Sequence, residues 1–354
     1  MTTTARLLLS CGILLVATPG FTQDGPRRPI EPPAATFPRG MGMGRGMIEP
    51  LRGPGPMPGW VQDTYTKNVE IGRANIFVLK NRNGQVRVTG NDGSTIRVTA
   101  IKRVREQNKD AGRALLQNIG IRLTERGGGV EVFTEDAPGN ITPTLVDYEV
   151  SLPSATKVTI TNTGAVSIQN VRGELRAEAF AGHIALLNVG RVRQAKTYSG
   201  GNIMITNAEG EEVSAEATLN AAILLRNVRA RNVELQVLNG NITATNVECD
   251  GCEFNSFNGD IEFSGALRRN GRYDFASSNG SIRMFIDGNV GFDLEALGST
   301  IRVNDFQLKQ TVPPSPASSA RSVLGSYGDA SAVVSVRTFK GSVTIGKAPA
   351  GGAR

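Results

Sequence analysis

The chain has few of the residues on which catalysis and metal binding usually depend. Its 354 residues include one histidine and three cysteines, and aromatic residues make up only 5% of the sequence. The single histidine, His183, stands in the turn-like phrase AGHI, and no G-x-S-x-G motif accompanies it. The carboxylates are scattered along the chain without a clear pair. The sequence therefore predicts no catalytic residue, no metal site and no cofactor, and it favours a protein that is not an enzyme.

Long apolar runs are also scarce. The run LLLSCGILLVA follows one arginine and precedes the small residues of TPGFT, a pattern typical of a secretory signal peptide. It is too short to span a membrane, so we expect cleavage after Thr22 and no transmembrane segment in the mature chain. A lipoprotein signal through Cys11 is the alternative, although it leaves almost no apolar region before the cysteine. Export predicts a periplasmic, cell-surface or extracellular location, and it argues against nucleic acid as the partner of this basic chain, whose net charge is +7.

Two cysteines remain after the signal peptide. Cys249 and Cys252 stand in the phrase VECDGCEF. In an exported protein such a pair can form a small disulfide, remain as reduced thiols or act as a redox centre. No second pair of cysteines or histidines completes a zinc site. A disulfide at a turn is the first expectation, with the other two states left open.

The chain changes character twice before its regular part begins. Residues 23–60 are rich in Pro, Gly and Met and lack periodicity, which predicts a disordered tether. Residues 61–153 alternate apolar and polar residues and contain one helical pattern, Arg105 to Ile119. We expect this region to cap a repetitive domain at residues 154–348, with a loop inserted at 308–328.

A phrase recurs at intervals of 18 to 21 residues after Pro153. The copies are NTGAVSI, FAGHIAL, SGGNIMI, LNAAILL, LNGNITA, FNGDIEF, SNGSIRM and LGSTIRV, with FKGSVTI after the insertion. Such a period is the mark of a solenoid, although Asn-Gly between alternating strands also suits an antiparallel meander. A column of asparagines at one phase of the repeat favours the solenoid, because stacked coils place equivalent turn residues in hydrogen-bonding register. The column contains Asn170, Asn188, Asn207, Asn227 and Asn246.

These patterns predict the fold class. We expect an all-β, single-chain parallel β-solenoid with rungs of about 19 residues, capped at its N-terminal end by strands and a short helix. The handedness of parallel crossovers favours a right-handed coil.

Strand alternation also predicts which residues face outward. Ala185, Leu187, Met204 and Leu224 form an apolar strip on a face that should be wet. The strip is either covered by the N-terminal strands or the tether, or it is a surface for a partner or for self-association. Glu262 and Arg283 occupy equivalent positions in adjacent rungs, which predicts a surface ion pair.

Several phrases together resemble one known family. They are NRNGQVRVTG, DGSTIRVTA, VDYEVSLP, the run of NG-x-I rungs and SAVVSVRTFKGSVTIGK. In this series the chain is similar to the bacterial putative-adhesin family of exported β-strand-repeat proteins, over about residues 65 to 347. The resemblance implies a β-helical fold and a cell-envelope or surface location. It carries over no catalytic residue.

The first functional hypothesis is therefore an exported, non-enzymatic solenoid that presents a repetitive surface to a glycan, an envelope component or a protein. One alternative is a β-helix polysaccharide lyase or hydrolase, which rests on fold analogy. The other is a structural envelope component that assembles through the ends of the solenoid.

Overall fold

A computed structural model describes residues 59–135, 144–310 and 321–348. The chain divides into two compact units, Met1–Gly53 and Pro54–Arg354, and all described residues belong to the second. The predicted signal peptide and residues 23–58 of the predicted tether lie outside the described residues and stay predictions. The fold below is that of the second unit.

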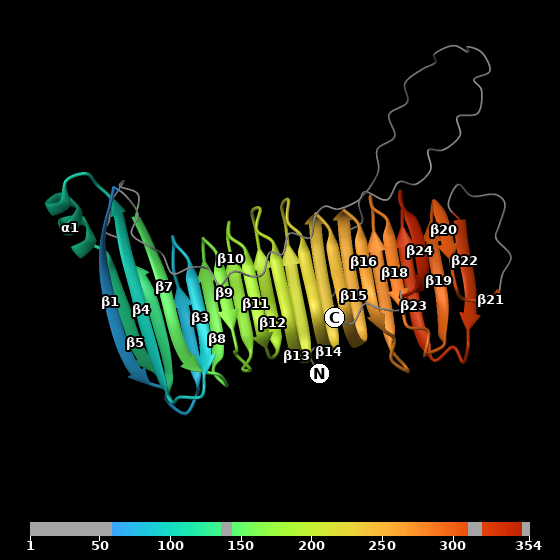
Figure 1. Cartoon of the computed structure of the whole chain (residues 1–354), viewed down its shortest axis with the longest axis horizontal. Helices are drawn as coiled ribbons and strands as arrows, with labels where there is room; N and C mark the ends of the chain where they lie inside the picture. The colour runs from blue at the N-terminus through green and yellow to red at the C-terminus, as the bar shows by residue number, and fades with distance from the viewer. Residues whose placement is uncertain (1–58, 136–143, 311–320, 349–354) are drawn as a thin grey trace, which may run out of the picture. The chain divides into compact units, whose positions relative to one another are not determined.

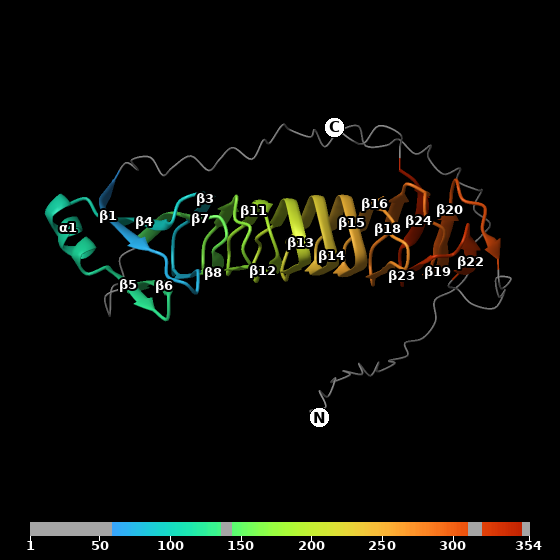
Figure 2. The same cartoon turned by 90° about the horizontal axis from the view of Figure 1, so that it is seen from below.

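Parallel strands wind in successive coils, and each coil contributes one strand to each of two stacks, here called stack A and stack B (Figures 1 and 2). In spatial order, stack A contains β6 (Gly129–Glu135), β2 (Ile76–Lys80), β8 (Lys157–Asn162), β10 (Leu175–Ala179), β12 (Val192–Thr197), the second parts of β13 (Ile203–Ala217), β14 (Ile223–Asn239) and β15 (Ile242–Asn258), then β17 (Arg272–Ser277), β23 (Ala332–Thr338) and β19 (Phe292–Gly298). Stack B contains β7 (Thr144–Pro153), β3 (Val86–Asn91), β9 (Val166–Gln169), β11 (Ile184–Val189), the first parts of β13, β14 and β15, then β16 (Ile261–Ala266), β18 (Ile282–Ile286), β24 (Ser342–Lys347) and β20 (Thr300–Val303). The prediction of an all-β, solenoid-like fold is confirmed.

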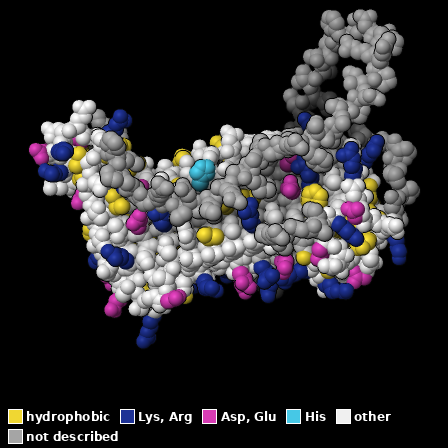
Figure 3. Space-filling model, viewed as in Figure 1, with side chains coloured by type: hydrophobic (Ala, Val, Ile, Leu, Met, Phe, Trp, Pro, Cys, Tyr) yellow, Lys and Arg dark blue, Asp and Glu magenta, His cyan; other side chains and the backbone are white. Residues whose placement is uncertain are grey.

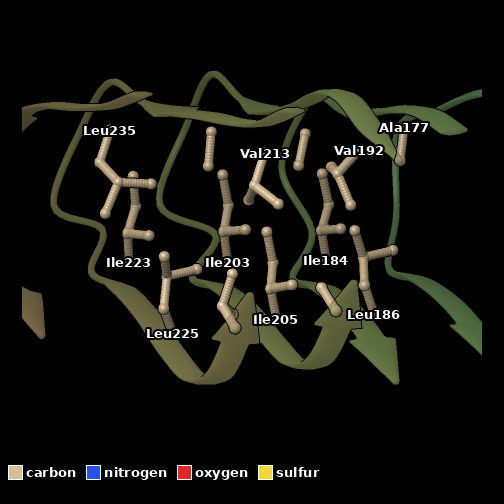
Figure 4. Close-up of a cluster of buried hydrophobic side chains, with 14 of the residues drawn as sticks. Ala177, Ile184, Leu186, Val192, Ile203, Ile205, Val213, Ile223, Leu225 and Leu235 are labelled. Atoms are coloured by element: carbon tan, nitrogen blue, oxygen red, sulfur yellow. The ribbon is translucent and has the colours of Figure 1, made fainter. Parts of the chain in front are cut away.

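The core lies between the two stacks and consists mainly of aliphatic side chains. Along each strand, buried and outward residues alternate, and equivalent inward residues pair between coils, as Ile184 does with Ile203 and Ile203 with Ile223. Figure 4 shows Ile203 and Leu225 meeting Val213 and Leu235 across the interior. The β-branched residues suit this pleated, enclosed environment.

The coils at both ends are stacked out of sequence order. At the N-terminal end, β2 and β3 lie between β6–β7 and β8–β9, and all of these pairings are parallel. At the C-terminal end, β23 and β24 are inserted between the β17–β18 coil and the β19–β20 coil. Part of the region expected as a cap therefore winds with the coils, and the boundary at 153/154 stays a prediction.

Antiparallel strands and one helix cover the ends. β4 (Thr95–Arg105) pairs with β7, β1 (Trp60–Glu70) pairs with β4, and β5 (Gly120–Arg126) pairs with β6. The helix α1 (Lys109–Gln117) is shorter than predicted, since Asn108 caps it by accepting hydrogen bonds from the Asp110 and Ala111 amides. The predicted loop at 308–328 contains two strands, β21 (Lys309–Gln310) and β22 (Arg321–Tyr327), and β22 covers β19. Residues 311–320 lie outside the described residues.

Candidate binding surface

The asparagine column lies at the corner that leads from stack B to stack A. All five residues have positive φ, between 53° and 57°, a conformation that asparagine tolerates better than most residues. Four hydrogen bonds join the five residues, each from an Nδ2 to the Oδ1 of the preceding coil, over 3.0 Å for Asn188 to Asn170, 2.9 Å for Asn207 to Asn188, 3.1 Å for Asn227 to Asn207 and 2.9 Å for Asn246 to Asn227. The amides are occupied in this ladder, so the column stabilises the corner.

Cys249 and Cys252 form a disulfide, and both side chains are buried. The hydroxyl of Tyr273 in the next coil donates to the carbonyl of Cys249 over 2.8 Å. The pair therefore staples one coil from the inside.

The apolar strip of Ala185, Leu187, Met204 and Leu224 lies on stack B. Ala185 pairs with Met204 and Met204 with Leu224, so these side chains are adjacent. All four are half-buried, because neighbours on a flat sheet cover one another. The strip stays a proposal as an interaction surface.

His183 is exposed, and its imidazole is coloured cyan in Figure 3. Its Nδ1 accepts a hydrogen bond from the backbone N–H of Asn202 in the next coil over 3.0 Å. Asn202, Asn241 and Asp260 accept from the next coil in the same way. The histidine is thus one member of a turn ladder.

The carboxylates are less scattered than the sequence suggested. Strand register places Glu234, Glu253 and Asp274 in adjacent coils on the outer face of stack A. Glu253 accepts from Asn255, and Asp274 binds Arg337 over 2.9 Å. Within the described ranges, no group of three or more His, Cys, Asp or Glu is placed to hold a metal ion.

The predicted pair of Glu262 with Arg283 is also corrected. The two residues are adjacent in register, but Arg283 binds Asp260, which lies at the turn, over 3.4 Å.

A row of exposed apolar side chains follows the corner that leads from stack A to stack B. We call it the apolar ridge, and it consists of Phe180, Leu219, Leu238, Phe257 and Phe339. Phe257 is 53% exposed and Phe339 is 80% exposed. Large apolar side chains are usually buried, so a row of exposed ones marks a candidate interaction surface.

The local sequence explains why the ridge points outward. The corners at 256–259 and 338–341 read SFNG and TFKG. The buried Thr338 hydroxyl donates to the Gly280 carbonyl of the preceding coil over 2.7 Å, and Ser277 donates likewise to Gly259 over 3.0 Å. Successive side chains of a strand point to opposite sides, so the residue after an inward Ser or Thr points outward.

Strand alternation alone does not reveal this ridge, although the sequence carries a signal for it. Ridge residues stand four positions before the first inward Ile or Val of a phrase, as Phe257 stands before Ile261 and Phe339 before Val343. The phrases FAGHI, LNGNI, FNGDI and FKGSV all begin with such a residue.

A groove of about 720 Å³ lies beside the C-terminal half of the ridge. Its bulky walls are Leu238 and Phe257 on one side and Phe339 and Leu297 on the other. Between them, the β17 coil presents only the small side chains Ala276 and Ser278. A coil with small side chains between two coils with large ones makes a notch.

The groove carries polar groups along its sides. Gln236 and Asn255 line it, and the amides of Asn239, Asn258 and Asn279 form a ladder next to the ridge with bonds of 2.6 and 2.7 Å. Two charged residues also line it, Glu216 and Arg337, and both are paired with an opposite charge. The hydrogen bond with Glu216 raises the pKa of its partner, Lys196.

Aromatic packing supports the groove from beneath. Phe254, Phe263 and Phe275 are fully buried in the same coils, and the rings of Phe254 and Phe275 stack with centroids 4.6 Å apart. Such a core holds the corner in one conformation.

The fold and this surface define an all-β, solenoid-like protein with an apolar ridge and a groove along one corner. The chain belongs to the Toastrack DUF4097 family, whose model matches residues 78–346. No helix in the described part of the chain is long and apolar enough to cross a bilayer.

Matches to solved structures come from several bacteria. A putative adhesin from Bacteroides fragilis is 14% identical, with 81% of this chain and 97% of that chain covered and a TM-score of 0.39. A putative cell adhesion protein from Clostridium sporogenes is 12% identical, with 81% and 100% covered and a TM-score of 0.21. A putative lipid binding protein from Parabacteroides distasonis is 10% identical, with 81% and 97% covered and a TM-score of 0.31. No curated protein matches the chain.

Proposed function

We propose that this chain is an exported, non-enzymatic β-solenoid that binds a glycan, envelope component or protein through the apolar ridge and its groove. One observation carries the proposal: five large apolar side chains are exposed along the same corner of the coil. Burying such a row on a partner gains about 25 cal/mol for each Å² of apolar surface removed from water. Family membership supports an adhesin-like role at the cell surface or in the periplasm.

The proposal includes the finer features of the coil. The asparagine ladders join residues 18 to 21 positions apart, which supports rungs of about 19 residues. The usual handedness of parallel crossovers supports a right-handed coil.

Retention of the mature chain, residues 23–354, on immobilised polysaccharides, envelope fractions and extracellular proteins tests the proposed function. The ridge variant Phe257→Ser/Phe339→Ser should lose at least tenfold in affinity for the material that retains the wild type. The matched variant Met204→Ser/Leu224→Ser removes two apolar side chains from the stack B strip and should retain binding. Loss of binding only in this second variant would move the site to the strip. Equal binding by all three chains would refute both surfaces.

A second candidate function is polysaccharide cleavage, favoured by the acidic column of Glu234, Glu253 and Asp274 beside the groove. Released fragments in the same samples would support it, provided that Asp274→Asn abolishes them. Retention without fragments favours the binding protein.

A further inference from the structure

We propose that the groove binds a neutral glycan chain, with one sugar ring seated in the notch over Ala276 and Ser278 between Phe257 and Phe339. This inference rests on the proposed binding function and narrows its partner to one chemical class. It follows from the spacing of the walls, the charge of the lining and the state of the local backbone.

The spacing of the walls fits one flat ring. Strand register aligns Phe257 with Ser278 and Ser278 with Phe339, because Ser256 pairs with Ser277 and Ser277 with Thr338. The two phenylalanines are therefore two coils, or about 9.6 Å, apart along the stack. A ring midway between them lies about 4.8 Å from each, within the distance at which flat rings stack. The apolar C–H face of a pyranose suits such a position.

The charge of the lining suits a neutral and hydroxyl-rich ligand. The side-chain amides that line the groove are those of Gln236 and Asn255. Amides both donate and accept hydrogen bonds, as sugar hydroxyls require. Glu216 and Arg337 are already neutralised by Lys196 and Asp274 over 2.8 and 2.9 Å, which leaves no net charge to attract an acidic polymer. An anionic membrane would need a cluster of unpaired cations, and the groove offers none among its described lining residues.

The local backbone argues against an extended peptide as the occupant. The carbonyls of the preceding coil accept hydrogen bonds from four backbone N–H groups of this corner, those of Ser278, Asn279, Phe339 and Lys340. A peptide strand binds a sheet mainly through free backbone groups, which this corner does not present. A peptide laid in the groove would leave its own backbone donors unpaired. A glycan has no such requirement.

Isothermal calorimetry on the mature chain tests the inference with cellohexaose, laminarihexaose and chitohexaose as neutral probes and hexagalacturonate as the acidic one. At least one neutral hexasaccharide should bind the wild type, and hexagalacturonate should bind it at least tenfold more weakly. Ser278→Phe fills the notch and Phe257→Ser removes one wall, so each should weaken the neutral glycan at least tenfold. Val333→Ser removes an exposed apolar side chain that belongs to neither the ridge nor the groove, so it is the matched control and should change affinity less than twofold.

Three outcomes would overturn this inference, and the first of them leaves the proposed binding function standing. If no neutral glycan binds, while Phe257→Ser abolishes retention on envelope or protein material, the glycan inference is overturned and the binding function stands. If the wild type is retained on no material, both are overturned. A dimer in sedimentation that Phe257→Ser dissociates would assign the groove to a second copy of the chain and overturn the glycan inference. Thermal unfolding midpoints close to that of the wild type show that the variants are folded.

Discussion

At the scale of single residues, Tyr273 joins two coils through one buried hydroxyl. The hydroxyl donates to the Cys249 carbonyl and accepts from the Arg268 amide, both over 2.8 Å. Burial is the main cause that raises the pKa of Tyr273 to about 12. An unperturbed tyrosine has a pKa of about 10. The folded chain therefore keeps this proton at pH values where the unfolded chain has released it.

This difference predicts an alkaline loss of stability. Between about pH 10 and pH 12, the unfolded chain binds fewer protons at Tyr273 than the folded chain, so the free energy of unfolding falls as the pH rises. Ultraviolet titration of the folded chain should show a tyrosine component near pH 12, and Tyr273→Phe should remove it. A titration in which all tyrosines ionise near pH 10 would contradict the prediction.

His183 gives a second prediction at this scale. Its Nδ1 accepts the Asn202 amide hydrogen bond that asparagine oxygens accept at the equivalent turns. His183→Ala should cost about 1 kcal/mol of unfolding free energy, the usual worth of one such bond. His183→Asn should recover most of that loss in urea unfolding. An equal loss in both variants would show that the bond does not matter.

The residue scale also shows what sequence-based prediction did not reveal about exposed surfaces. Alternation correctly marks Met204 and Leu224 as outward, but it does not tell how much of each side chain stays exposed. On a flat stack, neighbouring coils cover each other's side chains, whereas at a corner the chains splay apart and Phe257 or Phe339 remains exposed. Exposure depends on the curvature of the backbone, and a period in the sequence does not report curvature.

At the scale of elements, the corner glycines set how closely the coils approach. A Cβ added at Gly280 would lie 2.0 Å from the Gly259 carbonyl oxygen, and one added at Gly341 would lie 1.9 Å from that of Gly280. Backbone carbonyls cannot move aside without breaking the ladder between coils. The repeated Asn-Gly therefore reflects close contact between backbones as well as a turn.

Gly280→Ala should consequently destabilise the chain by about 3 kcal/mol, the upper range for overpacking. The matched variant Gly346→Ala places its Cβ 3.6 Å or more from its neighbours and should change stability by less than about 1 kcal/mol. Urea unfolding with circular dichroism compares the two. Similar midpoints for both variants would contradict close packing at this corner.

The same elements explain what the repeat does reveal. The asparagine column could be found in the sequence because a parallel coil returns each turn residue to one register, and meanders do not. The turn ladder of Asn202, Asn241 and Asp260 is less visible in the sequence, because His183 and Ala222 stand at two of the equivalent turn positions. A mixed column shows its register only in three dimensions.

At the scale of the whole molecule, the order of the coils departs from the order of the sequence at both ends. The β23–β24 coil lies between the β17–β18 coil and the β19–β20 coil, and the β2–β3 coil lies between the β6–β7 and β8–β9 coils. Spacing predicts a coil at β23–β24, since FKGSVTI keeps the phrase of the others, whereas β2 and β3 were expected in the cap. It could not predict their places, because pairing between distant segments depends on which edge is free when they meet.

The position of the β23–β24 coil in the stack shapes the groove directly. It places Phe339 and Arg337 opposite Phe257 and Asn255, with the β17 coil between them. In sequence order, the β19 coil would lie there and the notch would have a different wall. The candidate site thus depends on a rearrangement that only the structure reveals.

The apolar ridge is the central claim at this scale, and hydroxyl-radical footprinting tests it most directly. The mature chain is oxidised alone and with the envelope or glycan material that retains it, and oxidation of each residue is measured by mass spectrometry. The binding role of the ridge predicts at least a threefold fall in oxidation at Phe257 and Phe339. Oxidation of Met204, which lies on stack B away from the groove, should be unchanged. Protection at Met204 with continued oxidation of the two phenylalanines would contradict it.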